Sequence, residues 1–73
     1  MSKSSIGKAL RYFRKQAKMT QIDVAKKMNK SQQWVSDVEN GASVLYWGDV
    51  KKLCKIYNIT LSELSAKEDE LEW

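Results

Sequence analysis

Two adjacent glutamines, Gln32 and Gln33, carry the most informative polar chemistry in this sequence. They follow Ser31, a residue type that favours the N-cap of a helix, so both would lie in the first helical turn. A glutamine amide donates and accepts at once, and it matches N6 and N7 of adenine in the major groove of a DNA duplex. In isolation, such a pair is more often an ordinary solvent-exposed feature. The helices predicted around the pair are needed to choose between these two roles.

The segment before this pair is predicted to form a helix over residues 21–28. Thr20, followed three residues later by Asp23, forms a variant of the capping box that begins a helix. Asn29 tolerates the left-handed conformation best after glycine, so it suits the end of this helix. The expected inward row is Ile22, Ala25 and Met28, with Val24 beside them.

A second helix is predicted over residues 32–40, with Val35 and Val38 facing inward and Gly41 placed as a C-terminal glycine. The turn between the two helices is only three residues long, Asn29 to Ser31. Two helices joined by such a turn have the geometry of a helix-turn-helix, whose second helix enters the major groove. The side chains expected on the base-facing surface are Gln32, Gln33, Ser36 and Asp37.

Three further helices are predicted around this pair, which makes the expected fold all-α with five helices. The first has an apolar stripe at Ile6, Leu10, Phe13 and Ala17, and Ser4 or Ser5 is its expected cap. The fourth runs from Trp47 or Gly48 to Tyr57, and Asn58 is its expected C-cap. Its inward side is expected to consist of Trp47, Val50, Leu53, Cys54 and Tyr57. Thr60 is expected to cap a short fifth helix containing Leu61 and Leu64.

The 73 residues are expected to form one domain over 1–65, followed by an acidic tail over 66–73 that extends the last helix or frays. Residues 1–35 carry nine Lys or Arg against one acid, a charge of +8, whereas residues 36–73 carry four against eight, a charge of −4. Ordinary solvated helix faces would explain this asymmetry, but a basic half joined to a helix-turn-helix favours a polyanionic partner.

The composition argues against several other functions. With no histidine and one cysteine, the chain has too few ligands for a zinc site and no partner for an intramolecular disulfide. Cys54 would be the sole nucleophile, and its place on an apolar helix stripe predicts a core residue, so we expect neither an enzyme nor a cofactor or small-molecule site. No apolar run approaches the roughly 20 residues of a membrane span, and no signal peptide is evident, which favours the cytoplasm.

The stretch from Met19 to Gly41, with Ser-Gln-Gln-x-Val-x-x-Val-Glu-Asn-Gly at its end, resembles the Cro/repressor, or XRE-type, helix-turn-helix domain of lambdoid phage repressors. The resemblance extends from Ile6 to Leu64. It implies a five-helix domain in which the second and third helices read DNA. It also implies that Gln21 contacts a phosphate and braces Gln32. Asn40 matches a further phosphate contact, and Arg14 and Glu39 match an ion pair that ties the first helix to the third.

Two lysines depart from the family pattern. Lys18 stands where the family usually has glycine, which predicts a non-glycine residue at positive φ. Lys30 replaces the usual apolar residue of the turn and is free to contact phosphate.

An acid on the reading surface and a loop without basic residues are further departures. Asp37 stands where many relatives carry a basic or amide side chain; phosphates repel it, but it can accept a hydrogen bond from cytosine N4. Residues 42–46 lack the cations that often grip phosphate, and fewer phosphate contacts predict a shallower salt dependence. The cations expected to compensate are Arg11, Lys15 and Lys30.

Trp34 has two alternative roles, because it can pack on the helix pair or lie against a deoxyribose or a thymine methyl at the groove wall. Arg14 likewise has a structural alternative, which is favoured, and a phosphate-contacting one. The full set expected to contact or be positioned near phosphate is Gln21, Thr20, Ser31, Lys30, Arg14, Lys15, Asn40 and Trp34.

The resulting hypothesis is a bacterial or phage transcriptional regulator, with repression favoured, that binds a pseudo-palindromic duplex as a homodimer. Surplus apolar residues are expected at the dimer interface, with an intramolecular tail as the alternative: Val44, Leu45, Tyr46, Leu71 and Trp73. A small repressor, a restriction–modification controller and an antitoxin remain open as contexts. The competing class is a protein-interaction adaptor or antitoxin-like partner that uses the same scaffold without DNA.

Overall fold

The computed structural model describes residues 5–71, and all of its regular elements in this range are helices. The all-α prediction with five helices is therefore confirmed. The helices are α1 (Ser5–Gln16), α2 (Gln21–Met28), α3 (Gln32–Glu39), α4 (Trp47–Tyr57) and α5 (Leu61–Leu71). Ser4 and the side chain of Ser5, the two expected caps of α1, lie outside the described residues.

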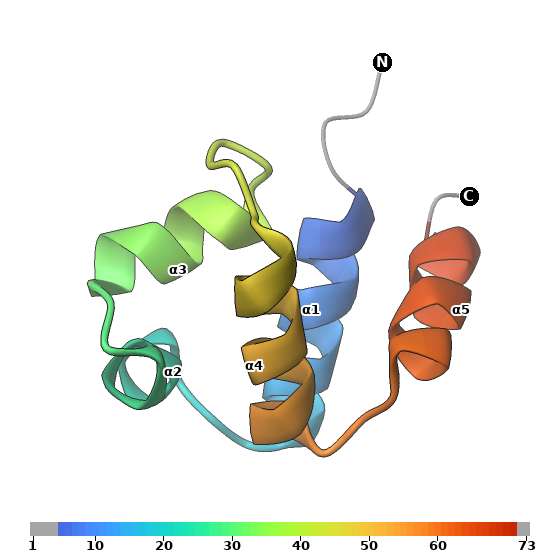
Figure 1. The fold of residues 1–73 in the computed structure, drawn as a ribbon, viewed down its shortest axis with the longest axis horizontal. Coiled ribbons are helices and arrows are strands. Elements are labelled where there is room, and N and C mark those ends of the chain that lie inside the picture. The colour runs from blue at the N-terminus through green and yellow to red at the C-terminus, as the bar shows by residue number, and fades with distance from the viewer. Residues whose placement is uncertain (1–4, 72–73) are drawn as a thin grey trace.

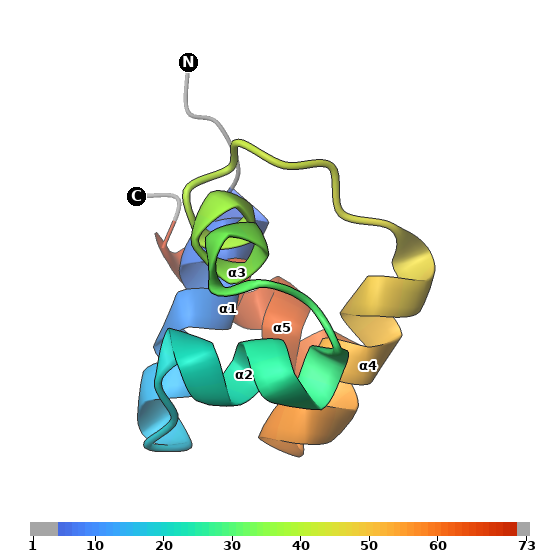
Figure 2. The same cartoon turned by 90° about the vertical axis from the view of Figure 1, so that its left-hand side faces the viewer.

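The helices α2 and α3 lie on one side of the molecule and α5 lies on the opposite side, with α1 and α4 between them (Figure 1). Figure 2 looks nearly along α3 while α2 runs across the view, so these two helices cross steeply. Within residues 5–71, no helix is long and apolar enough to cross a membrane.

The core receives side chains from all five helices. Its most completely buried large members are Leu10, Val24 and Leu53, and burial of such side chains stabilises the fold by about 1.5–3 kcal/mol each. Cys54 belongs to this core, as predicted, and burial raises the pKa of its thiol. The other buried apolar residues are Ala9, Ala25, Met28, Val35, Val38, Val50, Tyr57 and Leu64.

Two residues predicted to face inward are exposed instead. Ile22 is 49% exposed, because the buried face of α2 centres on Val24 and Met28, between about a third and a half of a turn away round the helix. Trp47 is 60% exposed, because it occupies the first position of α4, at the rim of the core. A periodic apolar row in the sequence does not determine which arc of the helix meets its neighbours.

The helix ends follow the predicted cap chemistry closely. Thr20 and Ser31 each accept a hydrogen bond from the first turn of the helix that follows, α2 and α3 respectively. Asn29 and Asn58 both end their helices in the left-handed conformation, at φ 57°. Lys18 also has positive φ, 59°, as its departure from the family glycine predicted.

The fifth helix extends into the acidic segment that was expected either to continue it or to fray. Thr60 and Glu63 form a reciprocal capping box at its start, with hydrogen bonds of 2.8 and 3.0 Å. The helix then continues without interruption across residue 66 to Leu71, which packs against the core.

The backbone of α1 approaches the end of α3 closely at Gly7. A Cβ atom at this position would lie 2.7 Å from the carbonyl oxygen of Glu39 and closer still to that of Val38. Only glycine therefore allows the two backbones to meet here. The contact fixes the start of α1 against the end of α3.

Candidate nucleic-acid interface

The start of α3 presents both candidate base-reading glutamines to solvent. Gln32 and Gln33 are exposed in the first turn, and the Ser31 hydroxyl accepts from the backbone N–H of Trp34 at 3.0 Å. This cap fixes where α3 begins and so which side chains stand at its N-terminus. Amides at a helix N-terminus also favour an anionic neighbour such as phosphate.

Three of the four predicted base-facing side chains, Gln33, Ser36 and Asp37, take part in hydrogen bonds between residues one turn apart. Gln33 Nε2 donates to Asp37 Oδ1 at 2.9 Å, and Asn40 Nδ2 donates to Ser36 Oγ at 3.4 Å. The first bond follows from the i, i+4 spacing, which brings side chains together on a helix surface. That spacing is visible in the sequence, but the sequence reasoning treated the two residues separately.

The start of α2 is held by a reciprocal capping box. The Thr20 N–H donates to Asp23 Oδ2 at 2.9 Å, and the Asp23 N–H donates to Thr20 Oγ1 at 3.1 Å. Hydrogen bonding of the Thr20 backbone and side chain to the Asp23 carboxyl lowers the pKa of this group. Gln21 follows the Thr20 cap and is the first residue of α2.

A buried polar network connects the three helices α1, α2 and α3. Arg14 Nε donates to Glu39 Oε2 at 2.6 Å, and its Nη2 donates to Glu39 Oε1 at 3.1 Å. The third donor, Nη1, binds the Met19 carbonyl at 3.0 Å in the connection to α2. Both residues are buried, at 8% and 6% exposure, and the hydrogen bond to Glu39 raises the pKa of Arg14.

Gln21 joins this network from α2. Its Nε2 donates to Glu39 Oε1 at 3.1 Å. The resemblance implied that Gln21 braces Gln32, and in the free protein the Gln21 amide is bonded to Glu39. Glu39 was predicted only as the partner of Arg14, because residues 18 positions apart carry no local spacing signal.

Trp34 lies partly buried against the hydrophobic core, so the packing alternative describes its position in the free protein. The Lys30 ammonium lies 5.4 Å from the centroid of its ring, within the range of a cation–π interaction. Lys30 itself is exposed, as are the other expected phosphate neighbours Lys15, Thr20 and Asn40. Among residues 5–71, no group of His, Cys, Asp and Glu could hold a metal ion.

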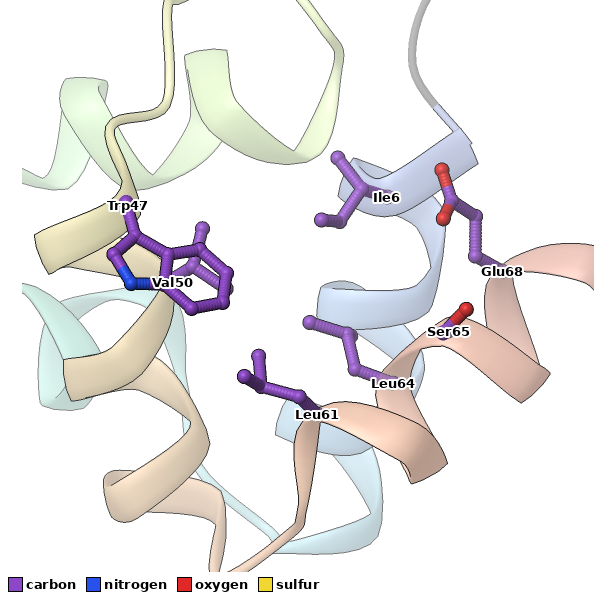
Figure 3. Close-up of a pocket in the computed structure, with 7 residues that line it drawn as sticks. All are labelled: Ile6, Trp47, Val50, Leu61, Leu64, Ser65 and Glu68. Carbon is purple, nitrogen blue, oxygen red and sulfur yellow. The ribbon is translucent and has the colours of Figure 1, made fainter.

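An apolar groove lies away from this surface, between α4 and the helices α1 and α5 (Figure 3). Its cavity volume is about 270 Å³. The Trp47 indole points across it toward the α1 and α5 side. The residues that line it are Ile6, Trp47, Val50, Leu61, Leu64, Ser65 and Glu68. Sequence reasoning missed the groove, because its lining comes from three separate helices.

The predicted dimer residues divide into two groups. Val44 and Tyr46 are 70% and 69% exposed in the chain that leads into α4. Leu45 and Leu71 are partly buried and pack against their own core, as in the intramolecular alternative for the tail. Trp73 lies outside the described residues.

Comparisons with known proteins agree with this architecture. The family model described as "Helix-turn-helix domain" matches residues 5–66, and among curated protein sequences no match to the chain was found. The crystal structure of the clp gene regulator ClgR from C. glutamicum is similar in fold, with a TM-score of 0.88 and 18% identity over 96% of this chain and 90% of that chain. The chain belongs to the helix-turn-helix domain family.

Proposed function

We propose that this protein is a sequence-specific, double-stranded DNA-binding transcriptional regulator of the Cro/XRE type, acting in the cytoplasm. The observation that carries the proposal is the exposed amide pair of Gln32 and Gln33 at the capped start of α3. In this mode α3 enters the major groove and the two amides meet base edges. Each good bidentate contact contributes about 1–3 kcal/mol of discrimination between bases.

The phosphate backbone is held by the surroundings of this pair. Gln21, at the N-terminus of α2, and the exposed Lys15 and Lys30 are the proposed phosphate contacts, together with Asn40. Arg14 acts as a positioning residue, because its guanidinium is buried and bonded to Glu39 and Met19. Each phosphate contact contributes about −0.9 to the slope of log affinity against log salt.

Repression is the favoured outcome, since a domain bound at an operator excludes other proteins from the same DNA. Binding to DNA in this way requires no catalytic step. Cys54, the one cysteine, is buried in the core with a raised pKa, which disfavours the reactive thiolate.

The protein acts as a homodimer on a pseudo-palindromic site in this proposal. The second copy is the proposed occupant of the apolar groove, because one surface offers both a hollow and neighbouring exposed apolar side chains, Tyr46 and Trp47. A two-fold interface needs this self-complementarity. Half-sites would then lie about one helical turn, 34–36 Å, apart.

Sedimentation equilibrium tests the dimer. Val44→Glu and Trp47→Glu are expected to give monomers, whereas Ser62→Glu, on the exposed side of α5, should leave the mass unchanged. A wild-type protein that stays monomeric at high concentration and on DNA contradicts the dimer.

In-vitro selection of duplexes from a random pool tests the function. The expected result is enrichment of one site with two-fold symmetry. A pool that stays random, with binding set by salt alone, contradicts sequence-specific recognition. Absence of duplex binding even in the nonspecific range of about 1–100 μM would favour a protein-interaction adaptor or antitoxin-like partner.

A further inference from the structure

On the proposed base-facing side of α3, one of the two glutamines is hydrogen-bonded to an acidic side chain. Gln33 is exposed, and its Nε2 donates to Oδ1 of the partly buried Asp37 at 2.9 Å. Both residues stand on the helix that the proposed function sends into the major groove. The pair therefore limits what the Gln33 amide can offer to a base.

The hydrogen-bond inventory of an amide makes this limit specific. A glutamine has two N–H donors on Nε2 and one acceptor oxygen. The major-groove edge of guanine presents two acceptors, N7 and O6, so a bidentate contact with guanine uses both N–H donors. Adenine presents the acceptor N7 and the donor N6, so its contact uses one N–H and the oxygen.

With one N–H of Gln33 occupied by Asp37, the remaining N–H and oxygen match adenine and not guanine. The carboxylate adds to this selection, because it is an acceptor and carries negative charge beside the amide. It would face the two acceptors of guanine unfavourably, whereas the amino group of adenine is a donor.

We propose that Asp37 is a specificity-determining residue that acts through Gln33, making it select adenine and reject guanine at the base it faces. This inference rests on the proposed function, since it requires α3 in the major groove. Asp37 is a positioning residue in this role, because it need not touch the base itself.

The experiment uses the full chain and the duplex obtained by selection. Gln33→Ala first identifies the base pair at which preference is lost. At that pair, the wild-type protein should prefer A·T over G·C on the order of 10- to 100-fold by fluorescence anisotropy. Replacing that adenine with 7-deazaadenine, which lacks the N7 acceptor, should weaken binding at least several-fold.

Asp37→Ala frees the second N–H, and it should reduce the preference for adenine to within about threefold. Asp37→Asn keeps an acceptor oxygen at the same place and should retain most of the preference. Asp69→Ala, which removes an exposed acid on α5, controls for the change in net charge and should leave the preference unchanged. Circular dichroism on each variant establishes that it is folded.

The outcomes separate the inference from the proposed function. If no site is enriched in the selection, the proposed function fails. If a site is enriched but Asp37→Ala keeps the wild-type preference, or the wild type prefers guanine, the inference alone is overturned. If the Gln33–Asp37 bond only stabilised the helix, Asp37→Ala would change thermal stability without changing the ratio of the affinities for the A·T and G·C duplexes.

Discussion

The starts of α2, α3 and α4 have nearly the same backbone conformation but different chemistry. Thr20, Ser31 and Tyr46 precede these helices at φ −87°, −85° and −84°, with extended ψ in each case. Thr20 and Ser31 accept hydrogen bonds from the helices that they cap, whereas Tyr46 makes no side-chain cap bond. The three helix starts thus share one backbone conformation, but only those of α2 and α3 have an N-cap side chain that accepts a hydrogen bond.

The same contrast holds for the two surfaces. On the α2–α3 side, the buried Arg14–Glu39 pair, the Thr20–Asp23 capping box and the Ser31 cap fix where polar side chains stand. On the α4–α5 side, the groove and the exposed Tyr46 and Trp47 offer apolar area and few directional bonds. Directional hydrogen bonds position a surface that must discriminate between bases, whereas an apolar surface suits burial against a partner.

The largest expected effect comes from breaking the buried network. Glu39→Ala leaves the Arg14 guanidinium buried without its carboxylate and also releases Gln21, so unfolding free energy should fall by about 3–5 kcal/mol. Urea unfolding measures this change. Glu70→Ala removes the exposed partner of Lys67 and should have little effect. Equal effects of the two variants would mean that the network does not anchor the α2–α3 side.

Gly7→Ala is expected to be the next most damaging change. The added methyl would overlap backbone oxygens of Val38 and Glu39, and relieving this overlap should cost about 1–3 kcal/mol. Gly48→Ala is the matched control, because nothing lies within 4 Å of its added Cβ in α4. That variant should gain up to about 0.5–1 kcal/mol, since alanine has a higher helix propensity than glycine. Thermal unfolding compares them, and two changes of the same sign would contradict this account.

The caps provide a smaller test of the contrast between the two sides. Thr20→Ala and Ser31→Ala should each reduce stability by about 1 kcal/mol, because each removes a bonded N-cap. Tyr46→Ser should act in the opposite direction by up to about 1 kcal/mol, because it supplies the missing cap to a backbone already in the required conformation. Chemical unfolding at a fixed protein concentration checks both expectations. A monomeric Tyr46→Ser variant that is less stable than the wild type would contradict the second.

The smallest expected effect is the pH dependence of stability that comes from Tyr57, a core residue beside the Arg14–Glu39 network. Burial, with a further contribution from Glu39, raises the pKa of Tyr57 above its ordinary value of 10.0. The folded state therefore favours the neutral phenol, and this contribution to stability is complete below pH 10 and is lost as pH rises above it. Tyr57→Phe should lack this alkaline loss, which parallel thermal unfolding of the two proteins at several pH values would reveal.

The sequence predicts the local features of this fold well, because caps and turns depend on neighbouring residues. The residue types at the helix ends predict the observed caps. Thr20 with Asp23 and Ser31 are N-caps, and Asn29 and Asn58 are left-handed C-caps. The positive φ of Lys18 was predictable only through the family pattern.

Features that depend on packing were predicted less well. Ile22 and Trp47 were expected inside, but which arc of a helix is buried depends on the helices around it. The close approach at Gly7 had a usable signal, since a glycine inside a helix is unfavourable unless packing requires it. The Gln21–Glu39 bond and the groove had no such signal, because both join residues far apart in the chain.

The measurement that tests the central claim most directly is the affinity of wild type and Gln32→Ala for the selected duplex and for a scrambled one, at one salt concentration. Because Gln32 is exposed at the start of α3, its loss should weaken binding to the selected duplex by about 1–3 kcal/mol and leave binding to the scrambled duplex unchanged. An equal change on both duplexes, or none on either, would contradict base reading by α3.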